Sequence, residues 1–266
     1  MQNEITSLNN DLVKQTLKLH QKKYRDEEKK FLLEGFKAIE EAFLAKIEFE
    51  YVFVEKNKAG KYGFIINPSP ALRAPSPARG EGKIIITNEA VLKKISTTDS
   101  PPEAVAVAKQ KIYTLKDIKS TKKVVLLENI KDLGNLGTII RTAKAFNQDA
   151  IILFGQTADI YNPKCVRSAV GNLWKIPIVQ IKDFEILKEN FNGFDKAAAL
   201  PNSKGSILLK DFTAKPPYLI MFGSESEGLS KELIDFADKK LTIEMSDEVE
   251  SLNLAVSVGV VLYKIG

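Results

Sequence analysis

The segment KVVLLENIKDLGNLGTIIRTAKAFN, residues 123–147, sets the pattern for the second half of this 266-residue chain. Its first part, KVVLLEN, is an apolar run with the length of a buried strand. A glycine-containing turn follows, and the remainder carries apolar residues at helical spacing. A buried strand that leads directly into a helix predicts one unit of a parallel sheet, in which helices connect the strands.

The same alternation continues to the end of the chain. Five further segments are typical of strands, with helical stretches between most of them: AIILFG, IPIVQI, KAAAL, YLIMFG and LTIEM. This pattern predicts an α/β domain built around a mainly parallel sheet. In such sheets the ligand site lies beyond the carboxyl ends of the strands. The polar residues that directly follow strands are therefore the candidates for function.

The first 120 residues are organised differently. The first 30 residues are charged and helical in pattern, FLLEGFKAIEEAFLA (31–45) has helical spacing, and EYVFVE and KIIIT are typical of short strands. Residues 57–82 hold four of the eleven prolines, which predicts a mobile surface insertion rather than a strand or helix. The stretch from Ser100 to about Lys123 is interpreted as a connection. Two domains are expected, residues 1–110 and residues 120–266, of which the second is the α/β domain.

Composition excludes several classes of chemistry. The chain has one cysteine, Cys165, and one histidine, His20, so neither an intramolecular disulfide nor a cysteine-rich zinc site is possible. His20 lies in a charged helical segment, which favours a surface residue over a catalytic base. No apolar run approaches the roughly 18 residues of a membrane span, and the polar N-terminus lacks a signal region. We expect a cytoplasmic protein with no metal and no membrane partner.

The positive charge is unevenly distributed. Residues 1–120 contain 21 Lys and Arg against 16 Asp and Glu, whereas residues 121–266 contain 18 of each sign. The whole formal excess of +5 therefore lies in the N-terminal part. Such an excess is compatible with a nucleic-acid partner, although ordinary solubility explains it equally well.

Three polar clusters follow predicted strands. The first contains Asn135, placed to cap a helix beginning near Leu136, and Arg141 within that helix. The second is FGSESEGLS, residues 222–230, where Glu225 and its neighbouring carboxylate would repel a phosphate. The third, IEMSDEVESLNLAVSVGVVLYKI (243–265), contains Ser251 and Asn253. Each residue alone is typical of a helix cap or a solvated side chain, but three clusters at three strand ends predict one site.

Taken together, the three clusters resemble a known family. ENIKDLGNLGTIIRTA, LIMFGSESEGLS and IEMSDEVESLNLAVSVGVVLY are similar, in order and spacing, to the three motifs of the SpoU (TrmH-like) ribose 2′-O-methyltransferases of the SPOUT superfamily. The resemblance covers about 145 residues from near Lys122 to the end. FLLEGFKAIEEAF resembles, more loosely, a small ribosomal-protein-like RNA-binding domain. The proline-rich segment departs from the family, away from the motifs.

The resemblance implies S-adenosylmethionine as methyl donor, a trefoil knot in the C-terminal domain, a homodimer and an RNA substrate. A donor without phosphates is compatible with a carboxylate-bearing turn. The separate N-terminal domain favours ribosomal RNA. Two alternatives stay open: a tRNA 2′-O-methyltransferase, and a catalytically silent RNA-binding or ribosome assembly factor on the same fold. A nicotinamide-dependent oxidoreductase would need a glycine fingerprint that the sequence lacks.

The resemblance also assigns roles to residues. Contacts to the donor are expected largely from backbone groups of Leu200, Gly223, Ile243, Met245 and Leu252. The expected catalytic residues are Arg141, Asn135, Glu225, Ser251 and Asn253.

Among these, Arg141 matches the family's essential arginine. A guanidinium is a poor base, so we expect Arg141 to fix a phosphate and orient the ribose hydroxyl rather than abstract its proton. Asn135 is expected to orient Arg141 or the ribose, and Glu225 to hold the arginine or the donor-binding loop. Arg167 and Ser168 resemble a family segment near the RNA phosphate.

Overall fold

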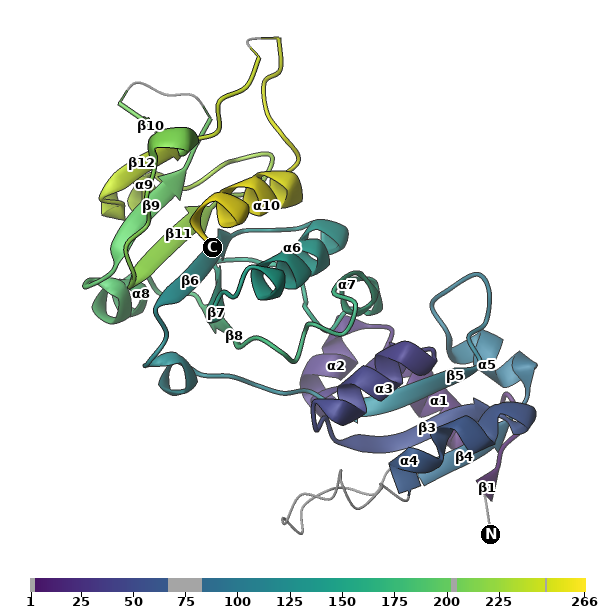
Figure 1. Cartoon of the computed structure of the whole chain (residues 1–266). Coiled ribbons are helices and arrows are strands. Elements are labelled where there is room, and N and C mark those ends of the chain that lie inside the picture. Colours follow the sequence, from purple (N-terminus) through teal and green to yellow (C-terminus); the bar gives the residue numbers. More distant parts are fainter. Residues whose placement is uncertain (1–2, 67–82, 202–204, 247) are drawn as a thin grey trace. The chain divides into compact units, whose positions relative to one another are not determined.

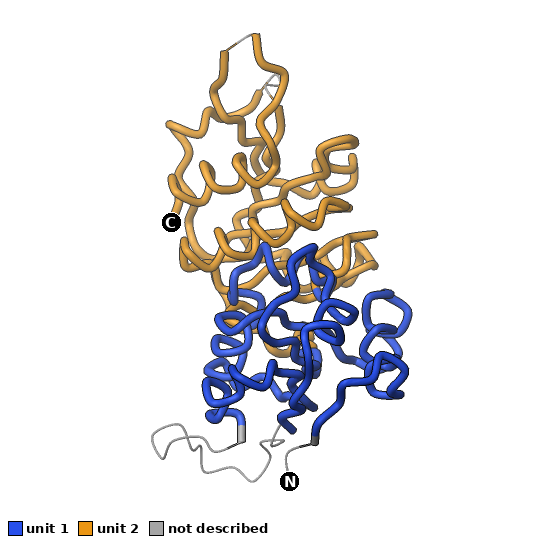
Figure 2. The backbone as a smooth tube through the Cα atoms, turned by 90° about the vertical axis from the view of Figure 1, so that its right-hand side faces the viewer, with its two compact units in different colours: residues 1–111, 161–174 blue, residues 112–160, 175–266 orange. Residues whose placement is uncertain are grey.

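The computed structural model describes residues 3–66, 83–201, 205–246 and 248–266 (Figure 1). The chain forms two compact units (Figure 2). The first comprises residues 1–111 and 161–174, and the second comprises residues 112–160 and 175–266. The chain therefore leaves the second unit after residue 160 and returns to it at residue 175.

The second unit contains a seven-stranded sheet in the order β10-β12-β9-β11-β6-β7-β8, in which every pair is parallel. Its strands are β6 (Lys123–Glu128), β7 (Ala150–Phe154), β8 (Ile178–Ile181), β9 (Asp195–Ala199), β10 (Ile207–Leu208), β11 (Tyr218–Phe222) and β12 (Lys239–Thr242). The predicted α/β fold with a mainly parallel sheet is confirmed, and each of the six predicted strands is present. The short strand β10 is an addition.

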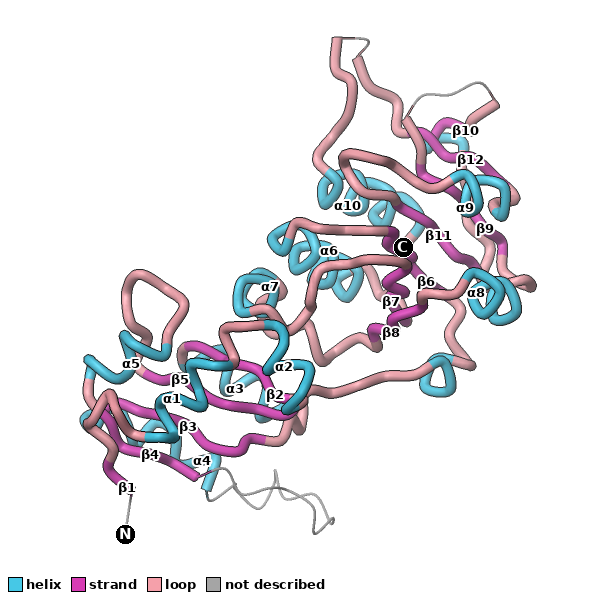
Figure 3. The backbone as a smooth tube through the Cα atoms, turned by 180° about the vertical axis from the view of Figure 1, so that it is seen from behind, coloured by secondary structure: helices cyan, strands magenta, loops and turns pink. Residues whose placement is uncertain are grey.

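Helices cover both faces of this sheet (Figures 1 and 3). The helices are α6 (Leu133–Ala145), α8 (Phe184–Phe191), α9 (Lys231–Phe236) and α10 (Leu254–Ile265), with short 3₁₀ turns η3 (Leu115–Ile118) and η4 (Leu209–Asp211). Val124 and Leu126 of β6 pack in one cluster with Leu187 of α8 and Leu233 of α9. Since successive side chains of a strand point to opposite faces, Val125 and Leu127 lie on the face that α6 and α10 cover.

The strand order places three strand ends side by side. Strand β11 lies between β9 and β6, with Met221 beside Ala198 and Phe222 beside Leu127, and β12 pairs with the other edge of β9. The chain thus passes from β8 at one edge back to the other half of the sheet. Ligands of parallel sheets bind where the order of strands reverses in this way, outside the carboxyl ends.

The first unit is a five-stranded mixed sheet in the order β1-β4-β3-β5-β2. Its strands are β1 (Asn3–Glu4), β2 (Lys30–Glu34), β3 (Phe49–Glu55), β4 (Lys83–Thr87) and β5 (Ala104–Lys109). Its helices are α1 (Asp11–Lys18), α2 (Lys22–Glu28), α3 (Phe36–Leu44), α4 (Gly63–Ile66), α5 (Glu89–Ile95) and α7 (Pro163–Ser168). No helix among the residues that the structure describes is long and apolar enough to cross a membrane.

Two predictions for the first unit are wrong. The predicted helix over residues 31–45 begins only at Phe36, because Lys30–Glu34 form strand β2 and Gly35 turns the chain with a φ of 83°. The stretch interpreted as a connection contains β5, a central strand that pairs with both β2 and β3. Short runs such as FLL and AVAVA become strands through these distant partners, which local spacing does not reveal.

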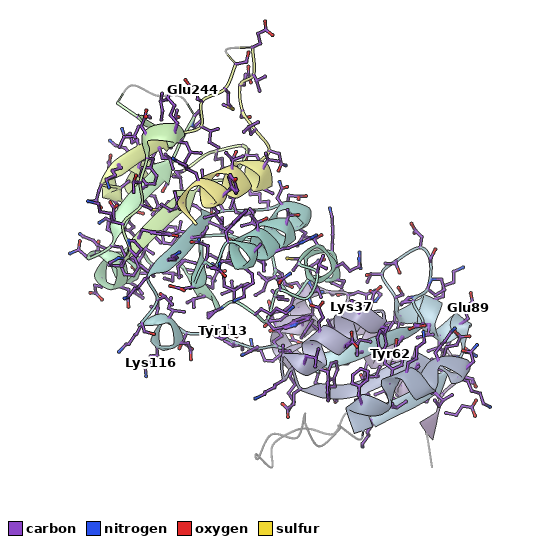
Figure 4. All side chains as sticks on the ribbon, viewed as in Figure 1. Lys37, Tyr62, Glu89, Tyr113, Lys116 and Glu244 are labelled. Carbon is purple, nitrogen blue, oxygen red and sulfur yellow. The ribbon has the colours of Figure 1, made fainter. Side chains whose placement is uncertain are left out.

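The predicted proline-rich insertion is also wrong in its first part. Residues 56–62 form a 3₁₀ turn, η1 (Lys56–Tyr62), which continues into α4. Tyr62, labelled in Figure 4, is fully buried and donates a hydrogen bond of 3.2 Å to Glu103. Residues 67–82 lie outside the described residues. His20, expected on the surface, is half-buried, and its Nε2 lies 2.9 Å from the Ile95 carbonyl oxygen.

Candidate active site

A cavity of about 610 Å³ opens in the second unit at the carboxyl ends of β9, β11 and β12. Residues 199–201 follow β9, residues 222–229 follow β11, and residues 250–254 lead into α10. The five residues predicted to contact the donor all line this cavity: Leu200, Gly223, Ile243, Met245 and Leu252. Three parts of the chain that are far apart in sequence, residues 199–201, 222–234 and 241–261, therefore contribute to one binding space.

The backbone of Leu200 is already engaged within the sheet. Its N–H donates to the Leu241 carbonyl at 2.8 Å, and its carbonyl accepts a 2.7 Å hydrogen bond from Thr242 Oγ1. A ligand would therefore meet the side chain of Leu200 or the second lone pair of its carbonyl oxygen, since the N–H is not available.

Gly223 is required by the chain's own turn. A Cβ at this position would lie 2.0 Å from the Gly228 carbonyl carbon and 2.2 Å from the Leu229 nitrogen. The turn is closed by the Gly228 N–H, which donates to the Ser224 carbonyl at 2.9 Å, while Gly228 itself has a φ of 67°. Only a glycine permits this close approach of the backbone to itself.

A hydrogen-bonded network joins the three predicted polar clusters. The Asn135 side chain donates through Nδ2 to Glu225 Oε1 and accepts through Oδ1 from Asn253 Nδ2 at 3.1 Å. Glu225 and Asn253 line the cavity, and Asn135 lies in the first turn of α6. Residues separated by about a hundred positions in sequence are thus brought together, as the three clusters predicted.

The cap of α6 differs from the one predicted. Asp132, rather than Asn135, caps α6 by accepting a 2.6 Å hydrogen bond from the Asn135 N–H. Because the backbone of Asn135 is satisfied in this way, its side chain reaches across to the other loops. Asn253 caps α10, accepting from the N–H groups of Ala255 and Val256 at 2.9 and 3.3 Å. The cap uses the amide oxygen of Asn253 and leaves its Nδ2 for Asn135.

Arg141 stands apart from this network. It lies six residues beyond Asn135 on α6, which is about 9 Å along the helix axis. Its side chain is exposed and does not line the cavity. Within the described part of the chain, no hydrogen bond or ion pair joins Arg141 to another residue, so Glu225 contacts Asn135 and not the arginine. Ser251 does line the cavity, with an exposed side chain.

Several lining residues were not singled out from the sequence. Glu250 adds a third carboxylate to those of Glu225 and Glu227 around the cavity, and Ser224 and Ser257 add hydroxyls. The glutamates repeated in SESEG and VES were the sequence feature that could have predicted these cavity carboxylates. Three carboxylates around a mainly apolar cavity disfavour a phosphate-bearing ligand and suit a cationic one.

Arg167 and Ser168 lie in α7, within the first unit, and do not line the cavity. Arg167 Nη1 lies 2.5 Å from Thr97 Oγ1 and 3.6 Å from Glu34 Oε1. Ser168 Oγ donates to the Lys164 carbonyl at 2.9 Å. Their expected place near an RNA phosphate stays a prediction.

Comparison with known proteins assigns both parts of the chain. The model of the SpoU rRNA Methylase family matches residues 122–263, and the model of the MRM3-like substrate binding domain matches residues 10–106. An uncharacterized tRNA/rRNA methyltransferase of Synechocystis sp. is 32% identical over 98% of this chain and 92% of its own length. The 23S rRNA (guanosine(2553)-2′-O)-methyltransferase RlmP of Bacillus subtilis is 28% identical over 98% of both chains.

A solved structure is similar over nearly the whole length. The AdoMet-bound rRNA methyltransferase from Sinorhizobium meliloti superposes with a TM-score of 0.85 at 30% identity, covering 98% of this chain and 96% of that chain. The similarity therefore includes both units and the cavity-bearing sheet.

Proposed function

Because the chain belongs to the SpoU rRNA Methylase family, we propose that it transfers a methyl group from S-adenosylmethionine to a ribose 2′-hydroxyl of ribosomal RNA. The observation that carries this proposal is the cavity at the ends of β9, β11 and β12, joined to α6 by the network of Asn135, Glu225 and Asn253. By their own descriptions, the Bacillus subtilis relative is a 23S rRNA methyltransferase and the Sinorhizobium meliloti protein is an rRNA methyltransferase.

The cavity suits the methyl donor in shape and charge. Apolar side chains of Leu200, Ile243 and Met245 offer surfaces for a flat base, and the carboxylates of Glu225 and Glu227 favour a positive charge. When bound, S-adenosylmethionine supplies an electrophilic methyl group on a positively charged sulfur. The chain's part is to hold that group beside the nucleophile and to exclude water from it.

Arg141 is proposed to grip the RNA. A guanidinium offers five N–H donors in a planar fork, which matches two phosphate oxygens at once. Arg141 is exposed and not committed to any described partner, so its fork is free to take the phosphate next to the target ribose. Its protonated state excludes proton abstraction by the arginine itself. Its role is to orient the hydroxyl for in-line attack.

The three-residue network is proposed to hold the cavity loops in register with α6. Asn135 ties the β11 loop, through Glu225, to the start of α10, through Asn253. Ser251 lies two residues before Asn253 and lines the same cavity, and its hydroxyl is proposed to contact donor or ribose. Precise placement of reacting groups supplies a large part of the rate of such transfers.

The first unit is proposed to bind the RNA. It carries the match to the MRM3-like substrate binding domain, and residues 1–120 contain the chain's whole excess of positive charge. This is the reason for preferring ribosomal RNA, because structured RNA is recognised by shape over a wide surface. The cytoplasmic location and the trefoil knot stay predictions.

A homodimer is also proposed. On α10, Val256, Val260 and Tyr263 are 50%, 39% and 78% exposed and follow one another at helical spacing. Tyr263 packs edge-to-face on Phe146, the residue that caps the C-terminus of α6, with ring centroids 6.0 Å apart, so the apolar strip continues to the end of that helix. A second copy would cover this strip. A Tyr263→Glu enzyme that keeps the wild-type mass in light scattering would contradict this interface.

The proposal is tested by titrating the protein with S-adenosylhomocysteine and then assaying tritiated-methyl transfer to total ribosomal RNA and to tRNA. We expect saturable binding and label in ribosomal RNA. Binding without transfer to either RNA would favour a silent RNA-binding factor. Label in tRNA alone would overturn the choice of substrate.

A further inference from the structure

The segment 161–174 belongs to the sequence range of the methylase family but is built into the first unit. At its start, the Tyr161 hydroxyl accepts from the Lys111 N–H at 2.8 Å and donates to the Lys111 carbonyl at 2.6 Å. The centroid of the Tyr161 ring lies 4.8 Å from the ring centroid of Phe31 in β2. The first unit is therefore completed by a piece of chain that follows it in sequence by fifty residues.

Within this segment, Arg167 takes part in an ordered relay. Its Nη1 donates to Thr97 Oγ1 at 2.5 Å, and the Thr97 hydroxyl donates to Glu34 Oε1 at 2.6 Å. The guanidinium also lies 3.6 Å from the same carboxylate oxygen. The donors and acceptors alternate correctly along the relay, so each hydrogen bond fixes the next.

Glu34 is the centre of this arrangement. Its side chain is only 4% exposed, at the end of β2 and directly before the turn at Gly35. Besides the Thr97 hydroxyl, it accepts from the Thr97 N–H at 3.0 Å, Ser96 Oγ at 2.9 Å and Thr98 Oγ1 at 3.4 Å. A buried carboxylate is destabilising unless it is hydrogen-bonded and its charge is balanced. Among the ion pairs of the described residues, the cation paired with it is Arg167.

We propose that Arg167 is a positioning residue: it balances the buried charge of Glu34 and fastens segment 161–174, with the 96–98 loop, into the RNA-binding unit. It contributes to RNA binding through this unit's structure and not through contact with a phosphate. The RNA part of this inference rests on the proposed function, whereas the structural part does not.

The structural part is tested by a double-mutant cycle of unfolding in the full-length protein. The variants are Arg167→Gln, Glu34→Gln and the double variant, with Lys93→Gln as control because Lys93 is an exposed lysine on α5, near the same loop. We expect Arg167→Gln to raise the unfolding equilibrium constant several-fold in the wild-type background and much less beside Glu34→Gln. The coupling between two residues in contact typically changes an unfolding equilibrium constant by roughly 2- to 150-fold. Additive effects would overturn the inference.

The pairing of Arg167 with Glu34 can be tested even if the single variant Arg167→Gln does not fold. If Arg167→Gln is unfolded, the double variant is expected to fold, because Glu34→Gln removes the uncompensated buried charge. A double variant that is also unfolded would contradict the proposal.

The RNA part is tested by the salt dependence of binding to ribosomal RNA fragments. Loss of one phosphate contact lowers the slope of log affinity against log salt by about one. For Arg167→Gln we expect the same slope of log affinity against log salt as for the wild-type protein. If Arg167→Gln binds RNA more weakly, Glu34→Gln should lose affinity to the same extent. A slope reduced by about one in Arg167→Gln alone would show a phosphate contact and overturn the positioning role. If the wild-type protein binds no RNA, the proposed function fails while the unfolding cycle still tests the pairing.

Discussion

Asn135 bridges Glu225 and Asn253, so that one amide side chain connects the first turn of α6 with the β11 loop and the start of α10. Both ends of the amide are used, its Nδ2 as donor and its Oδ1 as acceptor. No aspartate or leucine of similar size could make both contacts, because neither has one donor and one acceptor. The bridge thus needs a side-chain amide.

Asn135→Asp should reduce methyl transfer about 10- to 100-fold, because it removes the donor and places a second carboxylate beside Glu225. The loss of stability should stay near 1 kcal/mol, since the network is largely exposed. Initial rates and chemical unfolding measure the two effects. Thr138→Ala, an exposed change one turn along α6, serves as control and should retain activity. An Asn135→Asp enzyme with wild-type rates would exclude a functional role for the bridge.

Arg141→Lys should lower transfer at least about tenfold while leaving the binding of S-adenosylhomocysteine unchanged. Lysine keeps the charge but presents a point donor in place of the planar fork. Rates with saturating donor and a calorimetric titration separate the two effects. Near-full turnover by this variant would mean that the fork is not needed.

Gly223→Ala should destabilise the second unit by about 1–3 kcal/mol and weaken donor binding, because the new Cβ overlaps the backbone of Gly228. Gly193→Ala is the matched control, since a Cβ there meets nothing within 4 Å. Thermal unfolding and the same titration provide the measurement. Equal stability of the two variants would show that the turn can adjust to a Cβ at residue 223 without destabilising the protein.

Asp238→Asn should destabilise the protein near neutral pH and lose this effect in acid. Partial burial raises the pKa of the Asp238 carboxyl, but the Lys196 backbone N–H at 2.9 Å and the Lys196 ammonium outweigh it, so the pKa lies below the usual 3.8. A carboxyl whose pKa is lower in the folded state than in the unfolded state stabilises the folded protein at any pH above its unfolded-state pKa. This stabilisation is lost as the pH falls through the folded-state pKa. Unfolding free energies at pH 7 and pH 3 should show the difference between the two proteins shrinking. A constant difference would point to lost packing instead.

Much of the second unit could be predicted because its information is local. Strands such as YLIMF are apolar throughout, since both faces of a parallel sheet are covered, and polar residues at their ends mark the site. The convergence of Asn135, Glu225 and Asn253 followed from that geometry together with the family resemblance. The cap at Asp132 was missed because asparagine and aspartate are both good caps three positions apart.

The first unit was predicted less well because its strands depend on distant partners. FLLE of β2 and AVAVAK of β5 pair with each other across about seventy residues, and nothing near either segment signals this. The place of Arg167 has the same origin. Arg167 and its partner Glu34 lie in different domains of the sequence-based prediction, so only the folded chain brings the two together.

The most direct test of the central proposal is to locate the transferred methyl group on ribosomal RNA. After incubation with tritiated S-adenosylmethionine, the RNA is hydrolysed with alkali, which leaves an uncleaved dinucleotide wherever a ribose 2′-oxygen carries a methyl group. We expect the label in one alkali-stable dinucleotide with the wild-type protein and far less with Arg141→Lys. Label that appears on a base in mononucleotides, or no label at all, would contradict transfer to the ribose.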